Sequence, residues 1–230
     1  MARLKRETRE TWITLEVRRG DGEIQVDTGD TFLDHMLVTL ARYAGLGLQV
    51  EAGGDLRHHL IEDVGITLGL ALAMEVPERA ERYGWALVPM DEALVEAAVD
   101  VGGRPYFVGE LPSDLYRHFL ESMALNMRAT LHVEVRRGRD RHHVVESAVK
   151  AVGLALRQAL REGEGVFSTK GAVALEVEAE GTPTDPPETA GSLPPGTPPG
   201  SGGTSGQIDA GRTETGSTDT RPSDTGNGEA

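Results

Sequence analysis

The chain has 230 residues, no cysteine and a formal net charge of −14 at pH 7. Without cysteine, disulfides and thiolate metal sites are excluded, so nitrogen and oxygen must hold any bound metal. The acidic charge argues against nucleic acid as a partner, and no apolar run approaches the roughly 20 residues that span a membrane. The polar N-terminus lacks a signal-peptide stretch, and we expect a cytoplasmic protein.

The first part of the chain alternates between strand and helix patterns. In chain order, these patterns predict strands over 11–17 and 23–27, a helix over 31–43, a strand over 46–52 and a helix over 59–74. Turn residues at 19–22 separate the first two strands, and we expect those strands to pair as a hairpin.

The same order of elements follows a second time. The patterns predict strands over 85–88, 94–101 and 105–110, a helix over 114–129, a strand over 130–135, a helix over 144–161 and a last strand over 173–177. We therefore expect a domain over 1–178, made of tandem halves at about 1–92 and 93–178. The remaining residues, 179–230, are acidic and rich in Gly, Pro, Ser and Thr, which predicts a disordered tail.

A histidine motif occurs twice along the chain. HHLIED at 58–63 corresponds to HHVVES at 142–147, and TFLDHML at 31–37 corresponds to DLYRHFL at 114–120. His58 and His142 are 84 residues apart, as are Glu62 and Glu146, while His35 and His118 are 83 apart. Matching motifs at nearly equal intervals indicate an internal duplication.

The spacing within these motifs suits metal binding. Successive residues on a helix point about 100° apart, so adjacent histidines can serve two ions on either side of the helix. A glutamate three or four residues further on can share a face with either histidine. Six histidines and two glutamates would give each of two ions three imidazoles and one carboxylate, with positions left open for water or substrate. These ligand types leave Mn²⁺, Fe²⁺ and Zn²⁺ as alternatives.

Several motifs in one order resemble the imidazoleglycerol-phosphate dehydratase family across nearly all of residues 4–172. The matching stretches include RETRET at 6–11, TGDTFLDHML at 28–37, HHLIEDVGITLG at 58–69, PMDEAL at 89–94, HHVVESAVKA at 142–151 and STKG at 168–171. The resemblance implies an α+β fold of internally duplicated half-domains, in which two four-stranded sheets sandwich a four-helix bundle (ribosomal protein S5 domain 2-like). It also implies a homo-oligomer of 24 subunits built from trimers, with active sites at subunit interfaces.

The resemblance further implies a function and a set of site residues. The reaction would be the dehydration of D-erythro-imidazole glycerol phosphate to imidazole acetol phosphate in histidine biosynthesis. Two Mn²⁺ ions per active site would stabilise an imidazolate and a diazafulvene-like intermediate. The implied metal ligands are His35, His58, His59, Glu62, His118, His142, His143 and Glu146. The implied catalytic acid/base is Glu10, and the implied phosphate-binding residues are Arg82, Arg104, Lys150, Ser168 and Lys170.

One departure and two alternatives accompany this interpretation. The segment before His58 is a few residues shorter than is usual in the family, which places Arg57 beside the first histidine pair. A different di-metal enzyme, such as a phosphoesterase, is the first alternative, although such sites usually rely on several aspartates. A metal-dependent cage or storage protein is the second, although it would give the implied phosphate-binding arginines no purpose.

Overall fold

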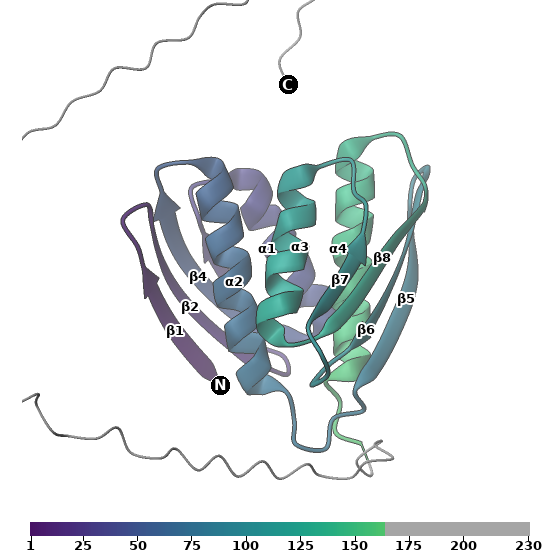
Figure 1. Ribbon diagram of the computed structural model, residues 1–230, viewed down its shortest axis with the longest axis horizontal. Coiled ribbons are helices and arrows are strands. Elements are labelled where there is room, and N and C mark those ends of the chain that lie inside the picture. Colours follow the sequence, from purple (N-terminus) through teal and green to yellow (C-terminus); the bar gives the residue numbers. More distant parts are fainter. Residues whose placement is uncertain (164–230) are drawn as a thin grey trace, which may run out of the picture. The chain divides into compact units, whose positions relative to one another are not determined.

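The computed structural model describes residues 1–163, in which one order of elements occurs twice (Figure 1). The first run is β1 (Ala2–Glu7), β2 (Thr11–Arg19), β3 (Ile24–Asp27), α1 (Thr31–Ala44), β4 (Leu46–Gly54) and α2 (Arg57–Glu75). The second is β5 (Tyr83–Met90), β6 (Ala93–Asp100), β7 (Tyr106–Gly109), α3 (Asp114–Met127), β8 (Thr130–Arg137) and α4 (Arg141–Ala159). The predicted internal duplication is confirmed. The second run starts at β5, however, so a division near residue 92 would separate β5 from β6.

The two runs form two sheets of the same topology. The strand orders are β1-β2-β4-β3 and β5-β6-β8-β7, and in each sheet only the last pair is parallel. The hairpin predicted for residues 11–17 and 23–27, which are β2 and β3 of the structure, is wrong. Strand β4 lies between them, where Val50 pairs with Leu15 on one side and with Val26 on the other. Helix α1 connects β3 to β4 and carries the chain back across the sheet, because two parallel neighbours need a crossover connection.

Strand β1 was not predicted. Its sequence, ARLKRE, buries only Ala2 fully, and its charged residues obscure the apolar alternation. It pairs with β2 along one edge of the first sheet, where charged side chains are commonly found.

The helices form a layer between the two sheets (Figure 1). Helices α1 and α2 contact the first sheet, and α3 and α4 contact the second, while α1 packs on α4 and α2 packs on α3. Their apolar faces supply the core, including the fully buried side chains of Leu37, Leu68, Phe119 and Leu120. The predicted fold class, two four-stranded sheets sandwiching four helices, is confirmed. Within residues 1–163, no helix is long and apolar enough to cross a membrane.

Two glycines at equivalent positions of the repeat bring the helix pairs close together. A Cβ on Gly69 would lie 2.4 Å from the carbonyl oxygen of Met123 on α3. A Cβ on Gly153 would lie 3.1 Å from the carbonyl oxygen of Leu40 on α1. Only glycine allows so close an approach of the two backbones, and this approach fixes the register of each helix pair. The register in turn places the first turns of the paired helices side by side.

Candidate metal centre

The structure brings together His35 at the start of α1 and His142 and Glu146 at the start of α4. Oε2 of Glu146 lies 3.2 Å from Nε2 of His35 and 2.9 Å from Nε2 of His142. The candidate ligand atoms of the three residues all lie within 4.8 Å of one another. We call this group inner cluster 1. Two imidazoles and one carboxylate at this separation suit a divalent first-row metal.

The carboxylate of inner cluster 1 is buried and charged. Glu146 is only 7% exposed. Burial by itself would raise the pKa of this carboxyl, but hydrogen bonds from Lys150, His35 and His142 outweigh burial and lower the pKa to about 2. Nζ of Lys150 lies 2.9 Å from Oε1 of the carboxylate. The other oxygen, Oε2, faces the two imidazole rings.

The paired helices α2 and α3 hold the equivalent group, His58, Glu62 and His118, which we call inner cluster 2. The ring centroids of His58 and His118 are 5.6 Å apart, and Nε2 of His58 lies 3.6 Å from Oε2 of Glu62. The Glu62 side chain is 44% exposed, compared with 10% for Glu146. Ile66 occupies the position equivalent to Lys150, so this carboxylate has no lysine beside it. The duplication has therefore kept the same candidate ligand types and changed their surroundings.

The second histidine of each pair faces away from its inner cluster. The rings of His58 and His59 are 6.2 Å apart at an interplanar angle of 85°, and those of His142 and His143 are 6.0 Å apart at 83°. This divergence agrees with the prediction that adjacent histidines on a helix point to different sides. We call His59 and His143 the outer histidines. Each faces a turn between the first two strands of its own half.

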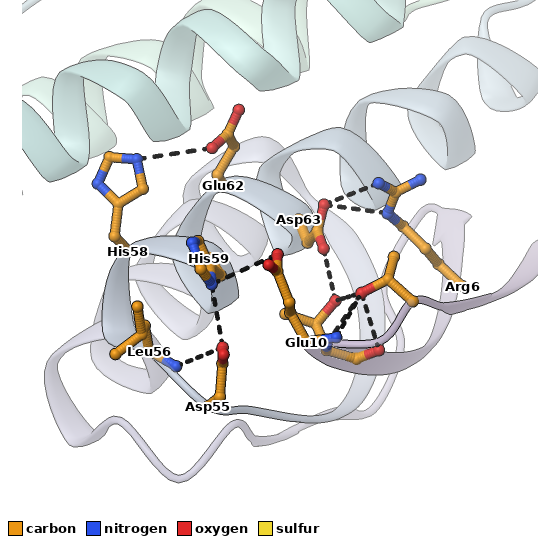
Figure 2. Close-up of polar contacts among 10 residues, drawn as sticks. Arg6, Glu10, Asp55, Leu56, His58, His59, Glu62 and Asp63 are labelled. Atoms are coloured by element: carbon orange, nitrogen blue, oxygen red, sulfur yellow. Dashed lines mark hydrogen bonds and ion pairs between the residues drawn. The ribbon is translucent and has the colours of Figure 1, made fainter.

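Carboxylates lie beside both outer histidines. Nδ1 of His59 lies 3.0 Å from Oδ1 of Asp55 and 3.4 Å from Oε2 of Glu10 (Figure 2). The hydrogen bond to Asp55 is the largest cause of a raised His59 pKa. Nδ1 of His143 lies 2.8 Å from Oε2 of Glu92, and this hydrogen bond raises the pKa of His143. Backbone N–H donation from Asp140 and the contact with His143 lower the Glu92 pKa to about 2.

A hydrogen-bond network holds the turn that carries Glu10 (Figure 2). Asp63, one residue beyond Glu62 on α2, accepts hydrogen bonds from Nε and Nη2 of Arg6 at 3.1 and 2.8 Å and from Oγ1 of Thr11 at 2.5 Å. The backbone N–H groups of Glu10 and Thr11 both donate to Oγ1 of Thr8. The β1–β2 turn is thereby fixed to the helix that carries the histidines.

Replacing Asp63 with Ala is expected to release this turn. Arg6 and Thr11 would lose a charged acceptor that is 13% exposed, and leaving such donors unpaired costs about 1–3 kcal/mol of folding free energy. We expect a lower melting temperature, because of the lost hydrogen bonds. An Asp63→Ala protein with wild-type melting temperature would show that the network does not hold the β1–β2 turn.

Arg57, placed beside the histidine pair by the shortened segment, connects the starts of two helices. Its Nε lies 2.5 Å from Oδ2 of Asp30, the residue that caps the N-terminus of α1. Asp30 also accepts the N–H of Leu33 at 2.8 Å. Burial would raise the pKa of Asp30, but the Arg57 and backbone hydrogen bonds outweigh it and lower that pKa. The helix bearing His35 and the helix bearing His58 are therefore tied together at their first turns.

Of the residues predicted to bind phosphate, Arg82 lies far from the histidine clusters. The backbone N–H of Arg82 donates to the carbonyl of Ala159, the last residue of α4, and its guanidinium binds Asp100 at 2.6 Å. Since α4 rises 1.5 Å per residue, this position is roughly 25 Å along the helix from His142. Arg104 lies on an exposed loop after β6, whereas Lys150 contacts Glu146. The predicted residues Ser168 and Lys170, the strand over 173–177 and the tail over 179–230 lie outside the described residues.

Asp55 and Glu92 were not predicted as site residues. Asp55 had a weak local signal, since it precedes His59 by four residues at the start of a helix, a spacing that permits contact. Glu92 had no such signal, because it is 51 residues from His143 in the sequence and meets it only through the β5–β6 turn.

Comparison with known proteins identifies the family. The family model for imidazoleglycerol-phosphate dehydratase matches residues 28–156. The chain is 47% identical to the imidazoleglycerol-phosphate dehydratase of Anaeromyxobacter sp. (strain Fw109-5) over 72% of this chain and 90% of that protein. It is 48% identical to the imidazoleglycerol-phosphate dehydratase of Pyrobaculum calidifontis over 73% of this chain and 97% of that protein.

Solved structures agree with the sequence matches. A crystal structure of IGPD from Pyrococcus furiosus in complex with (S)-C348 is similar with a TM-score of 0.67 and 44% identity, covering 74% of this chain and all of that one (100%). The imidazoleglycerol-phosphate dehydratase structure from Staphylococcus aureus gives a TM-score of 0.65 and 32% identity, covering 70% of this chain and 99% of that one. Together with the duplicated fold and the paired His/Glu clusters, these matches show that the chain belongs to the imidazoleglycerol-phosphate dehydratase family of hydro-lyases, enzymes of histidine biosynthesis.

Proposed function

We propose that the chain dehydrates imidazole glycerol phosphate with two Mn²⁺ ions, each held by three imidazoles and one carboxylate. The observation that carries this proposal is the presence of two equivalent inner clusters in one chain, each with two imidazoles and a carboxylate. The donor set fits the metal, because imidazole and carboxylate suit Mn²⁺ and the ligand atoms of inner cluster 1 lie within 4.8 Å of one another.

We propose that an outer histidine from another copy of the chain supplies the third imidazole to each inner cluster. His59 and His143 face away from the inner clusters of their own chain, towards the β1–β2 and β5–β6 turns. Arg82 lies at the far end of α4 from His142. Both facts fit a homo-oligomer in which neighbouring copies complete each active site, as in the proposed assembly of trimers into 24 subunits.

The chemistry explains why such a site is useful. The carbon proton that must be lost has no adjacent carbonyl, so the imidazole ring of the substrate has to accept the negative charge. Bound cations beside both ring nitrogens would supply positive charge that stabilises the ring as an anion. We propose that Glu10 moves the proton, because its turn is fixed to α2 and its half-exposed carboxylate lies beside His59. The hydroxyl leaves as water, and the resulting enol becomes the ketone of the product.

The phosphate would be held by cations and a hydroxyl group from a neighbouring copy. We propose Arg82, Arg104, Ser168 and Lys170 for this role, because guanidinium and ammonium groups bind phosphate through charge-assisted hydrogen bonds and a serine hydroxyl can donate one more. Asp100 holds the guanidinium of Arg82 in place. Lys150, also implied by the resemblance, is engaged with Glu146, and we propose that it keeps this carboxylate charged.

The proposal is tested by assaying dehydration of imidazole glycerol phosphate after chelation, with and without added Mn²⁺, beside a His143→Ala variant. We expect turnover only with metal and a large loss in the variant. Metal-dependent hydrolysis of the phosphate ester instead would favour a di-metal phosphoesterase. Tight Mn²⁺ binding without any turnover would favour a cage or storage protein.

A further inference from the structure

The two outer histidines are held by carboxylates from different places in the repeat. Asp55, which holds His59, lies just before α2, four residues before the histidine itself. Glu92, which holds His143, lies in the β5–β6 turn, far from the histidine in sequence. Arg139 occupies the position in the second half that is equivalent to Asp55, so the second half has no counterpart of that aspartate. The two halves thus make the same carboxylate–histidine contact with carboxylates from different positions of the repeat.

Glu92 is the repeat counterpart of Glu10. The two glutamates are 82 residues apart, and each lies in the turn between the first two strands of its half. Glu92 is fully engaged: Oε2 contacts His143 at 2.8 Å, while Oε1 accepts the backbone N–H groups of Arg139 and Asp140 at 3.1 and 2.9 Å. Within residues 1–163, the carboxylate of Glu10 has only a 3.4 Å contact with His59, and the side chain is 55% exposed.

We propose that Asp55 and Glu92 are positioning residues that orient the outer histidines, and that Asp55, by doing so, leaves Glu10 free for proton transfer. The part about Glu10 rests on the proposed function, whereas the part about the histidines rests on geometry alone. In the second half the turn glutamate itself holds the histidine. In the first half Asp55 holds the histidine, so the turn glutamate, Glu10, can face a substrate.

The physical basis is the tautomer of the imidazole ring. An ionised carboxylate can only accept a hydrogen bond, so Nδ1 of each outer histidine must be the donor. With the proton on Nδ1, the lone pair of a neutral ring lies on Nε2, the nitrogen that would then bind a metal ion. In His143 that ion would take the place of Oδ2 of Asp91, which lies 3.5 Å from Nε2. Carboxylates that hold histidine ligands in this way typically contribute 10- to 100-fold to metal affinity.

The main competing role for Asp55 is direct ligation. The candidate ligand atoms of Glu10, Asp55 and His59 lie within 4.8 Å of one another, so the three could share an ion without any other residue. An amide in place of the carboxylate separates the two roles. Asn keeps an oxygen that accepts the Nδ1 proton, but it lacks the charge that makes a carboxylate a strong metal ligand.

The test is the affinity of the full-length, chelator-stripped protein for Mn²⁺, measured by titration calorimetry. Asp55→Ala and Glu92→Ala are each expected to weaken binding about 10- to 100-fold. Asp55→Asn should recover most of that affinity, because His59 and the backbone N–H of Leu56 both contact the same oxygen of Asp55, Oδ1. Asp21→Asn, an exposed acid in the loop before β3 at the other end of the first sheet, is the matched control and should bind as the wild type does.

Two results would overturn the proposal. Wild-type affinity in both alanine variants would mean that the carboxylates do not orient the histidines. Equal losses in Asp55→Asn and Asp55→Ala would mean that Asp55 binds the ion directly. Mn²⁺ affinity is measured without turnover. A chain that fails to dehydrate imidazole glycerol phosphate would therefore refute the proposed function and the role of Glu10, but not the positioning of the outer histidines by Asp55 and Glu92.

Discussion

Replacing Glu146 with Gln is expected to lower the turnover number by at least about 100-fold. The carboxylate is the only acidic member of inner cluster 1, and both of its imidazole partners lie within 3.2 Å of one oxygen. A neutral amide would bind a cation weakly. Turnover of imidazole glycerol phosphate and the Mn²⁺ content after dialysis are the two measurements.

The matched control for this change is Glu62→Gln in inner cluster 2. Both variants should lose metal and turnover, but only Glu146→Gln should destabilise the metal-free protein, by about 1–3 kcal/mol, because Lys150 loses its charged partner. Glu62 has no such lysine and a half-exposed side chain. Full metal content and full turnover in Glu146→Gln would rule out inner cluster 1 as a metal site.

Replacing Glu10 with Gln is expected to lower the turnover number by about 10²- to 10⁴-fold, the usual contribution of a positioned acid/base group. Gln keeps the size of the side chain but cannot exchange a proton. Asp55 still holds His59 in this variant, so the affinity for Mn²⁺ should be unchanged. Steady-state kinetics and Mn²⁺ titration together check the prediction.

The repeat counterpart provides the comparison for Glu10. Both oxygens of Glu92 accept hydrogen bonds, one from His143 and the other from two backbone N–H groups. Because Gln has only one acceptor oxygen, Glu92→Gln should weaken Mn²⁺ binding, and excess Mn²⁺ should restore much of its turnover. Excess Mn²⁺ should not rescue Glu10→Gln. If added metal restored Glu10→Gln, Glu10 would be a residue of the metal site and not the proton-transfer group.

The repeated histidine motifs carried most of the site prediction, because helical spacing is a local property. The ring orientations of His58 and His59 follow from the 100° step of a helix, which the spacing of the two residues predicts. The grouping of His35 with His142 did not follow from spacing, since it depends on α1 packing against α4. The resemblance named candidate ligands but left open which of them would share an ion.

Strand pairing was harder to predict than the strands themselves. The strands around residues 11–17 and 23–27 exist, but β4 separates them, because a connection through α1 can return the chain between two strands that are neighbours in sequence. Strand β1 was missed because edge strands tolerate charged residues such as Lys5 and Arg6. Glu92 was missed because a contact made across a turn leaves no pattern in the local sequence.

We propose that each active site is completed between copies of the chain, and the turnover of mixed oligomers can test this arrangement. One variant, His142→Ala, has a broken inner cluster 1 and intact outer histidines. The other, a His59→Ala and His143→Ala double variant, has intact inner clusters and no outer histidines. Each alone should be inactive. When the two are co-assembled, some sites combine an intact inner cluster from one copy with intact outer histidines from another, so a fraction of wild-type turnover should return. Mixed oligomers as inactive as their parents would mean that every site lies within a single chain.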